Sequence, residues 1–126
     1  MYELSVKTHF SAAHHLAGYP GSCAHVHGHN WEVEIFFRGP KLNRIGILHD
    51  FRDIKTALRA VLEDLDHTDL NALPAFKGCN PTSENLARHL FKVMGRRFTT
   101  RQCSVVRVTV SEGPGTTASY WKHDDR

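Results

Sequence analysis

Two stretches of the chain alternate apolar and polar residues, and histidines stand where the two stretches approach each other. In residues 4–14 the apolar or small side chains occupy every second position and end at His14. The same alternation runs over residues 29–37 and begins at His29. A period of two is that of a half-buried β-strand. The connection between them is rich in glycine and proline, as loops are. The pattern therefore predicts two paired strands that bring their histidines together.

The connection ends in Cys23-Ala24-His25-Val26-His27-Gly28-His29, which places a thiol and three imidazoles within seven residues. In an extended backbone, His27 and His29 project from the same face, so both rings can bind one metal ion. A catalytic zinc ion typically takes three protein ligands and keeps a fourth position for water or substrate. A third histidine is available at His14, so the sequence predicts a zinc site formed by His14, His27 and His29.

The ordinary interpretation of a single histidine is a surface or satisfied core position, and this chain has ten histidines. A His-Gly-His sequence with a cysteine upstream and a second histidine pair nearby favours metal binding over that interpretation. His15 and His25 lie close to the three candidates and stay open as alternative ligands.

Length and composition limit the classes of protein and partner. At 126 residues the chain is one domain, residues 1–126, with little room for a deep cleft, which favours sites completed by neighbouring subunits. The net charge of +3 is compatible with an anionic ligand. The densest basic stretch, Arg96-Arg97 with Lys92 and Arg101, is expected to be a solvated helix end, because it lacks interleaved aromatic residues. No nucleic-acid partner is expected.

The cysteines and the N-terminus bear on the compartment. Cys23, Cys79 and Cys103 are odd in number and widely spaced, which favours a reducing compartment over a disulfide framework. The first residues lack the basic and apolar regions of a signal peptide, and no apolar run approaches the ~18 residues of a membrane span. We expect a cytoplasmic protein without a membrane partner.

Two helices are predicted in the middle of the chain. Asp50 has the short carboxylate of a helix N-cap, and apolar residues at helical spacing follow it, which predicts a helix over residues 51–65. The sequence Asn80-Pro81-Thr82-Ser83 is typical of a second helix start, and that helix is expected to end near Arg97. A short extended piece is expected at residues 45–48.

Alternation returns after the second helix. Three valines of residues 103–111 share one predicted face: Val106, Val108 and Val110. Glu112 continues that face, and a last strand is predicted over residues 117–122. The element order predicts an α+β fold, in which a four-stranded antiparallel sheet carries both helices on one face. The other face and an edge strand would be left uncovered, which implies assembly.

Several polar residues have both a structural and a functional interpretation. Asp66-His67, at the end of the first helix, is either surface decoration or an acid–base pair. Glu112 is either half solvated or placed to receive the donors of a ligand, because an unpaired buried charge is unfavourable. Thr82, Ser83 and Glu84 either cap the helix alone or bind a ligand.

Six short motifs occur in an order that resembles the pyruvoyl-tetrahydropterin synthase superfamily. They lie between about residue 4 and residue 121: Phe10-Ser11-Ala12-Ala13-His14, Cys23 with His27-Gly28-His29, Asp50-Phe51, Leu65-Asp66-His67, Asn80-Pro81-Thr82-Ser83-Glu84 and Ser111-Glu112. Three residues separate Cys23 from His27, which is similar to the 6-carboxy-tetrahydropterin synthase branch of queuosine and deazapurine biosynthesis. The pyruvoyl-forming animal enzymes usually have a longer gap.

The resemblance implies a zinc-dependent carbon–carbon lyase. Enzymes of the favoured branch convert dihydroneopterin triphosphate to 6-carboxy-tetrahydropterin and release acetaldehyde and triphosphate. The implied cofactor is Zn²⁺, and the implied partner is a small-molecule pterin triphosphate. The alternatives are a 6-pyruvoyl-tetrahydropterin synthase and, from another class, a zinc-binding module without turnover.

The resemblance also implies a role for each matching side chain. The three histidines would hold zinc, and Cys23 would be the base that moves a proton on the substrate side chain. Asp66 would orient His67 as the second proton carrier. Glu112 would accept the amino and ring N–H donors of the pterin and take part in proton relay.

The family fold implied by the resemblance is the tunnelling fold. In it the sheets of neighbouring subunits join into a barrel, and two trimers stack as a hexamer. Sites in the family lie between subunits, so Cys23 and the His67 or Glu112 that serves it can belong to different chains of a homo-oligomer.

Overall fold

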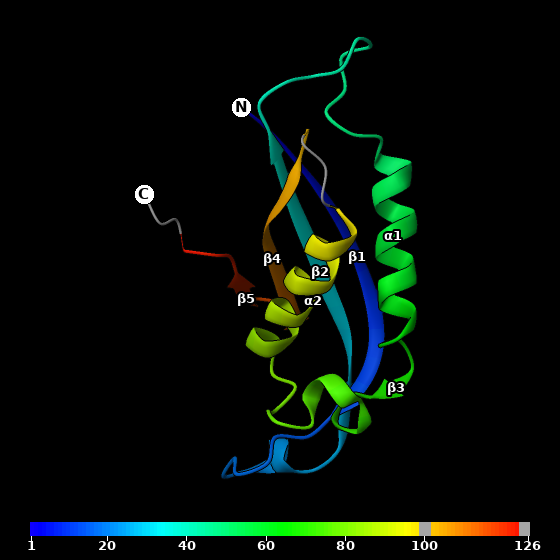
Figure 1. The fold of residues 1–126 in the computed structure, drawn as a ribbon. Helices are drawn as coiled ribbons and strands as arrows, with labels where there is room; N and C mark the ends of the chain where they lie inside the picture. The colour runs from blue at the N-terminus through cyan, green and yellow to red at the C-terminus, as the bar shows by residue number, and fades with distance from the viewer. Residues whose placement is uncertain (99–101, 124–126) are drawn as a thin grey trace.

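Five strands form one sheet, and two helices cover one of its faces (Figure 1). The computed structural model describes residues 1–98 and 102–123. The sheet order is β3-β1-β2-β4-β5. Four strands are antiparallel: β1 (Tyr2–His14), β2 (His27–Gly39), β4 (Ser104–Gly113) and β5 (Thr116–Tyr120). The fifth, β3 (Thr68–Asp69), runs parallel to β1. The α+β prediction is confirmed, but the sheet has five strands rather than four.

β1 and β2 extend along the molecule and pair over their full length. Tyr2 lies opposite Gly39 at one end of the pair, and His14 lies opposite His27 at the other. The alternation predicted from the sequence is present, because from Leu4 onward every second side chain of β1, and every second side chain of β2, is buried or half-buried. The histidines therefore meet where the long connection between the strands begins and ends.

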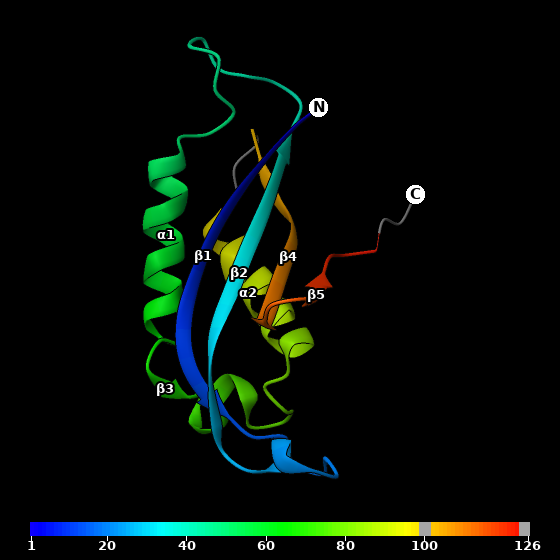
Figure 2. The ribbon, with the colours of Figure 1, turned by 180° about the vertical axis from the view of Figure 1, so that it is seen from behind.

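The two helices lie on the same face of the sheet. They are α1 (Phe51–Glu63) and α2 (Ser83–Arg97). Seen from behind, the strands lie in front of α2, which leaves the other sheet face uncovered in the described chain (Figure 2). Asp50 caps α1 by accepting from the Arg52 N–H at 2.9 Å, as its short carboxylate predicts. Among the described residues, no helix combines the length and the apolar character that a membrane crossing requires.

The core lies between the helices and the sheet. Its fully buried side chains come from β1, β2, both helices and β4, and include Trp31, Ile35, Phe37, Ile54, Leu58, Leu86, Leu90, Met94 and Val108. In residues 1–98 and 102–123, three short 3-10 helices line the connections: Ser22–Ala24, Leu70–Ala72 and Pro74–Phe76. This packing leaves the polar connections at the His14 end of the sheet, where α2 begins.

Two local predictions were wrong for identifiable reasons. Residues 45–48 form no strand, because the Asn43 side chain accepts from the Ile45 and Ile47 N–H groups at 3.0 and 3.1 Å and closes a turn. Val106 is only half-buried, because β4 has a bulge there: Val105 pairs with Phe37, and the residue after Val106 pairs with Phe36. The bulge places Val105 in the core instead.

Smaller differences concern the ends of elements. The first helix ends at Glu63 rather than near residue 65, and the last strand covers Thr116–Tyr120 rather than 117–122. The second helix ends at Arg97 as predicted. Arg101, which was counted in the basic stretch, lies outside the described residues.

Candidate metal centre

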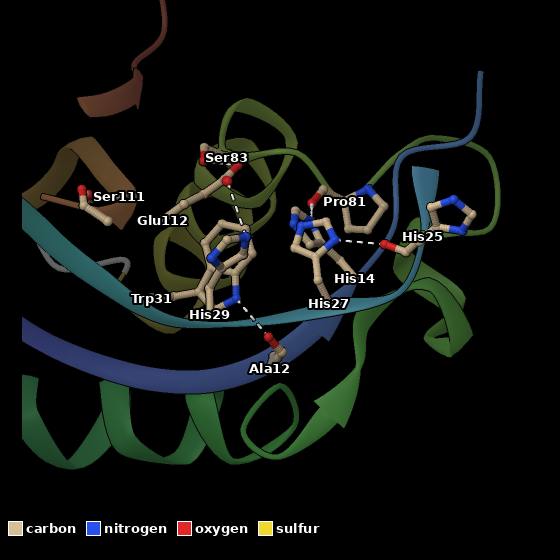
Figure 3. Close-up of polar contacts among 11 residues, drawn as sticks. Ala12, His14, His25, His27, His29, Trp31, Pro81, Ser83, Ser111 and Glu112 are labelled. Atoms are coloured by element: carbon tan, nitrogen blue, oxygen red, sulfur yellow. Dashed lines mark hydrogen bonds and ion pairs between the residues drawn. The ribbon is translucent and has the colours of Figure 1, made fainter. Parts of the chain in front are cut away.

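Three imidazoles converge at the end of the β1–β2 pair. His14 ends β1, while His27 and His29 project from the same face of β2 (Figure 3). One ring nitrogen from each of the three histidines lies within 4.8 Å of the other two. The ring centroids of His14 and His27 are 4.5 Å apart, and those of His27 and His29 are 4.8 Å apart. Rings this close can share one ion.

Two main-chain carbonyls determine which nitrogens face the centre. His14 Nδ1 lies 2.8 Å from the Pro81 carbonyl oxygen, and His27 Nδ1 lies 2.7 Å from the His25 carbonyl oxygen (Figure 3). A carbonyl can only accept a hydrogen bond, so each Nδ1 must carry the proton and donate. The Nε2 atom of each neutral ring then keeps a free lone pair, which is the form that binds a metal.

Burial leaves one of these atoms unsatisfied. The His14 side chain is fully buried, and its Nε2 has no hydrogen-bond partner among the described residues. Burial lowers the pKa of His14, and although the Pro81 hydrogen bond opposes this shift, the net direction favours the neutral ring. A buried acceptor without a partner is unfavourable by about 1–3 kcal/mol. A metal ion bound to this atom would remove that penalty, so the residues present fit a metal site.

Trp31 forms the apolar base of the cluster. Its side chain is fully buried, and its indole N–H donates to the Ala12 carbonyl at 3.2 Å. The Trp31 ring packs edge-on against His14 and His29, with centroid distances of 4.9 and 5.3 Å. Because the indole has its own acceptor in β1, it restrains both imidazoles from the core side.

Glu112 approaches the cluster from β4. One carboxylate oxygen accepts from the Ser83 hydroxyl at 3.2 Å, and the other lies 3.3 Å from His29 Nε2 (Figure 3). The contact with His29 lacks hydrogen-bond geometry, since within the described part of the chain His29 Nε2 is also without a hydrogen-bond partner. Ser83 is the first residue of α2, so the helix start connects directly to the candidate site. The predicted continuation of the β4 face to Glu112 therefore leads to the histidines.

Cys23 lies in the connection next to the histidines but outside the group that converges. It is half-buried in the short helix Ser22–Ala24, and its carbonyl accepts from the Leu16 N–H at 2.8 Å. Among the described residues, the side chains that meet closely enough to share an ion are the three histidines, without Cys23, His15 or His25. His25 contributes its carbonyl oxygen rather than its ring.

The Asp66–His67 pair occupies a different place, at the outer edge of β1. Asp66 accepts from the Ser11 N–H at 2.9 Å with one oxygen and lies 3.0 Å from His67 Nδ1 with the other. The Ser11 hydrogen bond is the largest cause of a lowered pKa of Asp66. His67 has φ +58°, a left-handed conformation uncommon for residues other than glycine, and its side chain is 81% exposed. This pair faces solvent rather than the His14 cluster of its own chain.

The sequence predicted the three converging imidazoles but not the two main-chain carbonyls that orient them. The structure brings His14, His27, His29 and Glu112 together and leaves Cys23 and the Asp66–His67 pair apart from them. The Pro81 and His25 carbonyls carry no residue-type signal, since every residue has one. The Asn80-Pro81-Thr82-Ser83 motif was the available sign, but it predicted a helix start and left a ligand role open only for Thr82, Ser83 and Glu84.

The fold and the cluster together define a class. This is a small α+β domain that can hold a metal ion through three imidazoles at one end of a mostly antiparallel sheet.

Comparisons with known proteins identify the family within this class. The family model described as 6-pyruvoyl tetrahydropterin synthase matches residues 3–123. An Archaeoglobus fulgidus protein provisionally named 6-carboxy-5,6,7,8-tetrahydropterin synthase is 36% identical over 109 residues, which is 86% of each chain. The Bacillus subtilis 6-carboxy-5,6,7,8-tetrahydropterin synthase is 31% identical over 126 residues, covering 94% of this chain and 84% of the relative. The chain therefore belongs to the 6-pyruvoyl tetrahydropterin synthase family, as the motif series predicted.

Solved structures agree with this membership. The Caenorhabditis elegans 6-pyruvoyl tetrahydropterin synthase has a TM-score of 0.86 and 26% identity, covering 97% of this chain and 96% of that one. The Plasmodium vivax 6-pyruvoyl tetrahydropterin synthase has the same fold, with a TM-score of 0.78 at 21% identity over 98% of both chains.

Proposed function

We propose that this protein is a zinc-dependent carbon–carbon lyase, a 6-carboxy-tetrahydropterin synthase that acts in queuosine or deazapurine biosynthesis. Its substrate is dihydroneopterin triphosphate, and its products are 6-carboxy-tetrahydropterin, acetaldehyde and triphosphate, with one water consumed. The observation that carries this proposal is the convergence of three imidazoles on one point within a chain of this family. The three-residue gap between Cys23 and His27 and the names of the relatives favour the carboxy branch.

His14, His27 and His29 would hold the zinc ion. Three nitrogen ligands with a remaining open position are typical of a catalytic zinc site. Bound zinc supplies Lewis acidity, which acidifies a coordinated hydroxyl and stabilises negative charge on a substrate oxygen. The carbonyls of Pro81 and His25 keep the ligand nitrogens oriented before any metal binds.

Proton transfer is assigned to side chains around the cluster. Cys23 would remove the proton from the substrate side chain, since a thiolate is the form of cysteine that can accept it. Asp66 holds His67 Nδ1 at 3.0 Å, which leaves His67 Nε2 as the atom that gives or takes a proton. Glu112 would accept the pterin N–H groups, and its distance of 3.3 Å from His29 Nε2 would place the pterin beside the metal.

The proposed active form is a homo-oligomer, and within the family pattern a hexamer whose sheets join into a barrel. His67 faces solvent at the outer edge of β1, away from the cluster of its own chain, as expected if it serves a neighbouring subunit. β3 pairs with β1 at Ala12 and Ala13 alone, so most of the outer β1 edge is unpaired in the described chain. An unpaired edge favours strand addition from another copy. The odd, widely spaced cysteines favour the reducing cytoplasm for this assembly.

The test is to incubate the purified protein with dihydroneopterin triphosphate and to measure acetaldehyde and triphosphate. The proposed reaction releases both in equal amounts, because two of the three side-chain carbons leave together. Triphosphate without acetaldehyde would instead identify the 6-pyruvoyl reaction, which keeps the side chain intact. Neither product would identify a zinc-binding module without turnover.

The 6-pyruvoyl alternative is supported by the likeness to the Caenorhabditis elegans enzyme of that name. A Cys23→Ala variant provides the control for both reactions, since it should keep its zinc and lose turnover. Full activity of this variant would contradict the role assigned to Cys23.

A further inference from the structure

The three residues that follow His14 are held by two asparagines from distant parts of the chain. Asn71 accepts from the His15 N–H at 2.9 Å and donates to the His15 carbonyl at 3.1 Å. Asn80 does the same for Ala17, with both distances 3.0 Å. A side-chain amide that pairs with both backbone groups of one residue replaces a neighbouring strand at that position. The segment 15–17 is therefore held at both of its ends.

Each asparagine is itself anchored. The Asp69 carboxylate accepts from the Asn71 N–H at 3.1 Å, which fixes Asn71 at the start of a short helix. The Asn80 carbonyl accepts from the Asn85 side chain at 2.8 Å, which ties Asn80 to the first turn of α2. The segment after His14 is thus connected to two elements that pack in the core.

Asn80 acts beside the residue that orients His14. The next residue, Pro81, provides the carbonyl that accepts from His14 Nδ1 at 2.8 Å. The Asn80 side chain and the Pro81 carbonyl therefore contact the chain at Ala17 and at His14, the last residue of β1. If the Asn80 contact with Ala17 is lost, the chain after His14 can move relative to Pro81. The distance between the Pro81 carbonyl and the His14 ring is then less restrained.

The same segment holds the Cys23 connection. Leu16 lies between the two clamped residues, and its N–H donates to the Cys23 carbonyl at 2.8 Å. Residues 15–17 therefore link His14 on one side to the cysteine-bearing short helix on the other. Movement of this segment would shift both together.

We propose that Asn71 and Asn80 are positioning residues that hold His14 in the arrangement that binds metal and keep the Cys23 connection fixed beside it. Of the two, Asn80 has the larger effect, because its neighbour Pro81 orients the His14 ring directly. This inference rests on the proposed metal site and not on the proposed reaction. It assigns to Asn80 a role beyond the start of α2.

The test is the affinity for zinc alone, measured by competition with a chromophoric chelator. Residues that orient metal ligands typically change metal affinity by about 10- to 100-fold. Asn80→Ala should therefore bind zinc at least about tenfold more weakly than the wild type, and Asn71→Ala should show a smaller loss in the same direction. Co²⁺ bound in place of zinc should show weaker visible absorption in Asn80→Ala, because the band intensity reports tetrahedral geometry.

Asn43→Ala is the matched control. Asn43 also makes two side-chain hydrogen bonds to backbone N–H groups, but its turn follows the far end of β2 (Figure 1). This variant should lose comparable stability and keep wild-type zinc affinity. Equal zinc affinity in the wild type and both clamp variants, or an equal loss in Asn43→Ala, would overturn the positioning role.

A milder variant tests the proposal if Asn80→Ala folds poorly, and a measurement without metal tests the clamp independently of zinc binding. Asn80→Asp keeps the acceptor for the Ala17 N–H and loses the donor, so its zinc affinity should lie between those of the wild type and Asn80→Ala. Amide hydrogen exchange at Ala17, measured without metal, should be faster in Asn80→Ala than in the wild type. Unchanged exchange would overturn the clamp itself, whereas a wild-type protein that binds no zinc would overturn the proposed function and the positioning role together.

Discussion

His14 combines complete burial with one satisfied and one unsatisfied ring nitrogen. The satisfied atom depends on a carbonyl 67 residues further along the chain, and the unsatisfied one faces two other imidazoles. A fully buried polar atom without a partner is uncommon in a native protein and calls for a physical reason. Here the reason we propose is a metal ion, which converts an unfavourable buried acceptor into a ligand.

Replacing the histidines of β2 tests the ligand set. His27→Ala and His29→Ala should each weaken zinc binding by more than about 100-fold, because a lost ligand matters more than a lost orienting contact. The measurement is zinc content by mass spectrometry after gel filtration. His25→Ala is the control, since its ring is exposed and its carbonyl remains. Stoichiometric zinc in both β2 variants would exclude this ligand set.

We expect a second histidine, His89, to make the stability of the fold depend on pH. Burial is the main cause of the lowered pKa of His89, and the charge of Arg96 adds to it, while Asp64 opposes both. The unfolded chain, with an ordinary pKa of 6.5, then takes up a proton before the folded protein does. The stability associated with neutral His89 is complete above about pH 6.5 and is lost as the pH falls towards the lowered pKa of the folded state.

His89→Gln should therefore lose less unfolding free energy than the wild type between about pH 7.5 and about pH 5. Urea unfolding in the presence of a chelator measures this difference without metal binding. His9→Gln, at an exposed position, should behave like the wild type. Parallel pH profiles for wild type and His89→Gln would contradict the assignment.

At the scale of elements, alternation predicted more than any single motif did. Strands β1, β2 and β4 follow a period of two, and both helices follow a helical period, because each has one face against a single core. β3 escaped prediction because two residues are too few to show a period. The turn at Asn43 and the bulge at Val106 were not predicted, because both depend on hydrogen-bond partners rather than on the hydrophobic pattern.

The candidate site was predictable to a similar extent. Two histidines two residues apart on a strand predict a pair of ligands on one face. His14 is then predicted as the third ligand, because the pairing of β1 with β2 places it opposite His27. Asn71 and Asn80 did not stand out, because their partners are 56 and 63 residues away and their side chains bind backbone groups of any residue type. Contacts of this kind depend on the completed fold.

Gly39 shows how closely two elements approach at the far end of β2. A Cβ atom built there would lie 1.9 Å from the Gln102 carbonyl oxygen and 2.6 Å from Leu48 Cδ1. Gly39→Ala should therefore lower the free energy of unfolding by about 1–3 kcal/mol, as overpacking does. Gly28→Ala, in the same strand with open space around it, should have a much smaller effect in the same urea experiment. Equal effects would argue against this close approach.

At the scale of the whole molecule, one sheet face is covered by helices, and the other is polar and is left uncovered by the residues that the structure describes. On the uncovered face, the Arg107 guanidinium lies 4.0 Å from the centre of the Phe36 ring, and Lys7 pairs with Glu32 at 3.7 Å. Side chains of this kind suit a face that stays hydrated, including the inside of an oligomeric barrel. Assembly through strand edges would leave this polar face as it is.

Shared sites predict complementation between inactive variants. Cys23→Ala and His67→Ala should each be inactive alone, and light scattering should show a hexamer for both. If one site takes these residues from different chains, refolding the two variants together in equal amounts should restore roughly a quarter of wild-type activity, because chains assort at random. No recovery from mixed hexamers would place both residues in the same chain.

The length of β1 also sets the distance between its first residue and the histidines of the candidate metal centre. β1 is a strand of 13 residues without a register shift against β2, so its rise of about 3.3 Å per residue separates Tyr2 from His14 by about 40 Å. A nitroxide attached at residue 2 and a paramagnetic Cu²⁺ ion bound by the histidines of the same chain would therefore give a dipolar coupling that reports this spacing in pulsed electron resonance. The position of the bound ion can thus be read without a crystal, and a within-chain spacing far below about 40 Å would place the ion elsewhere.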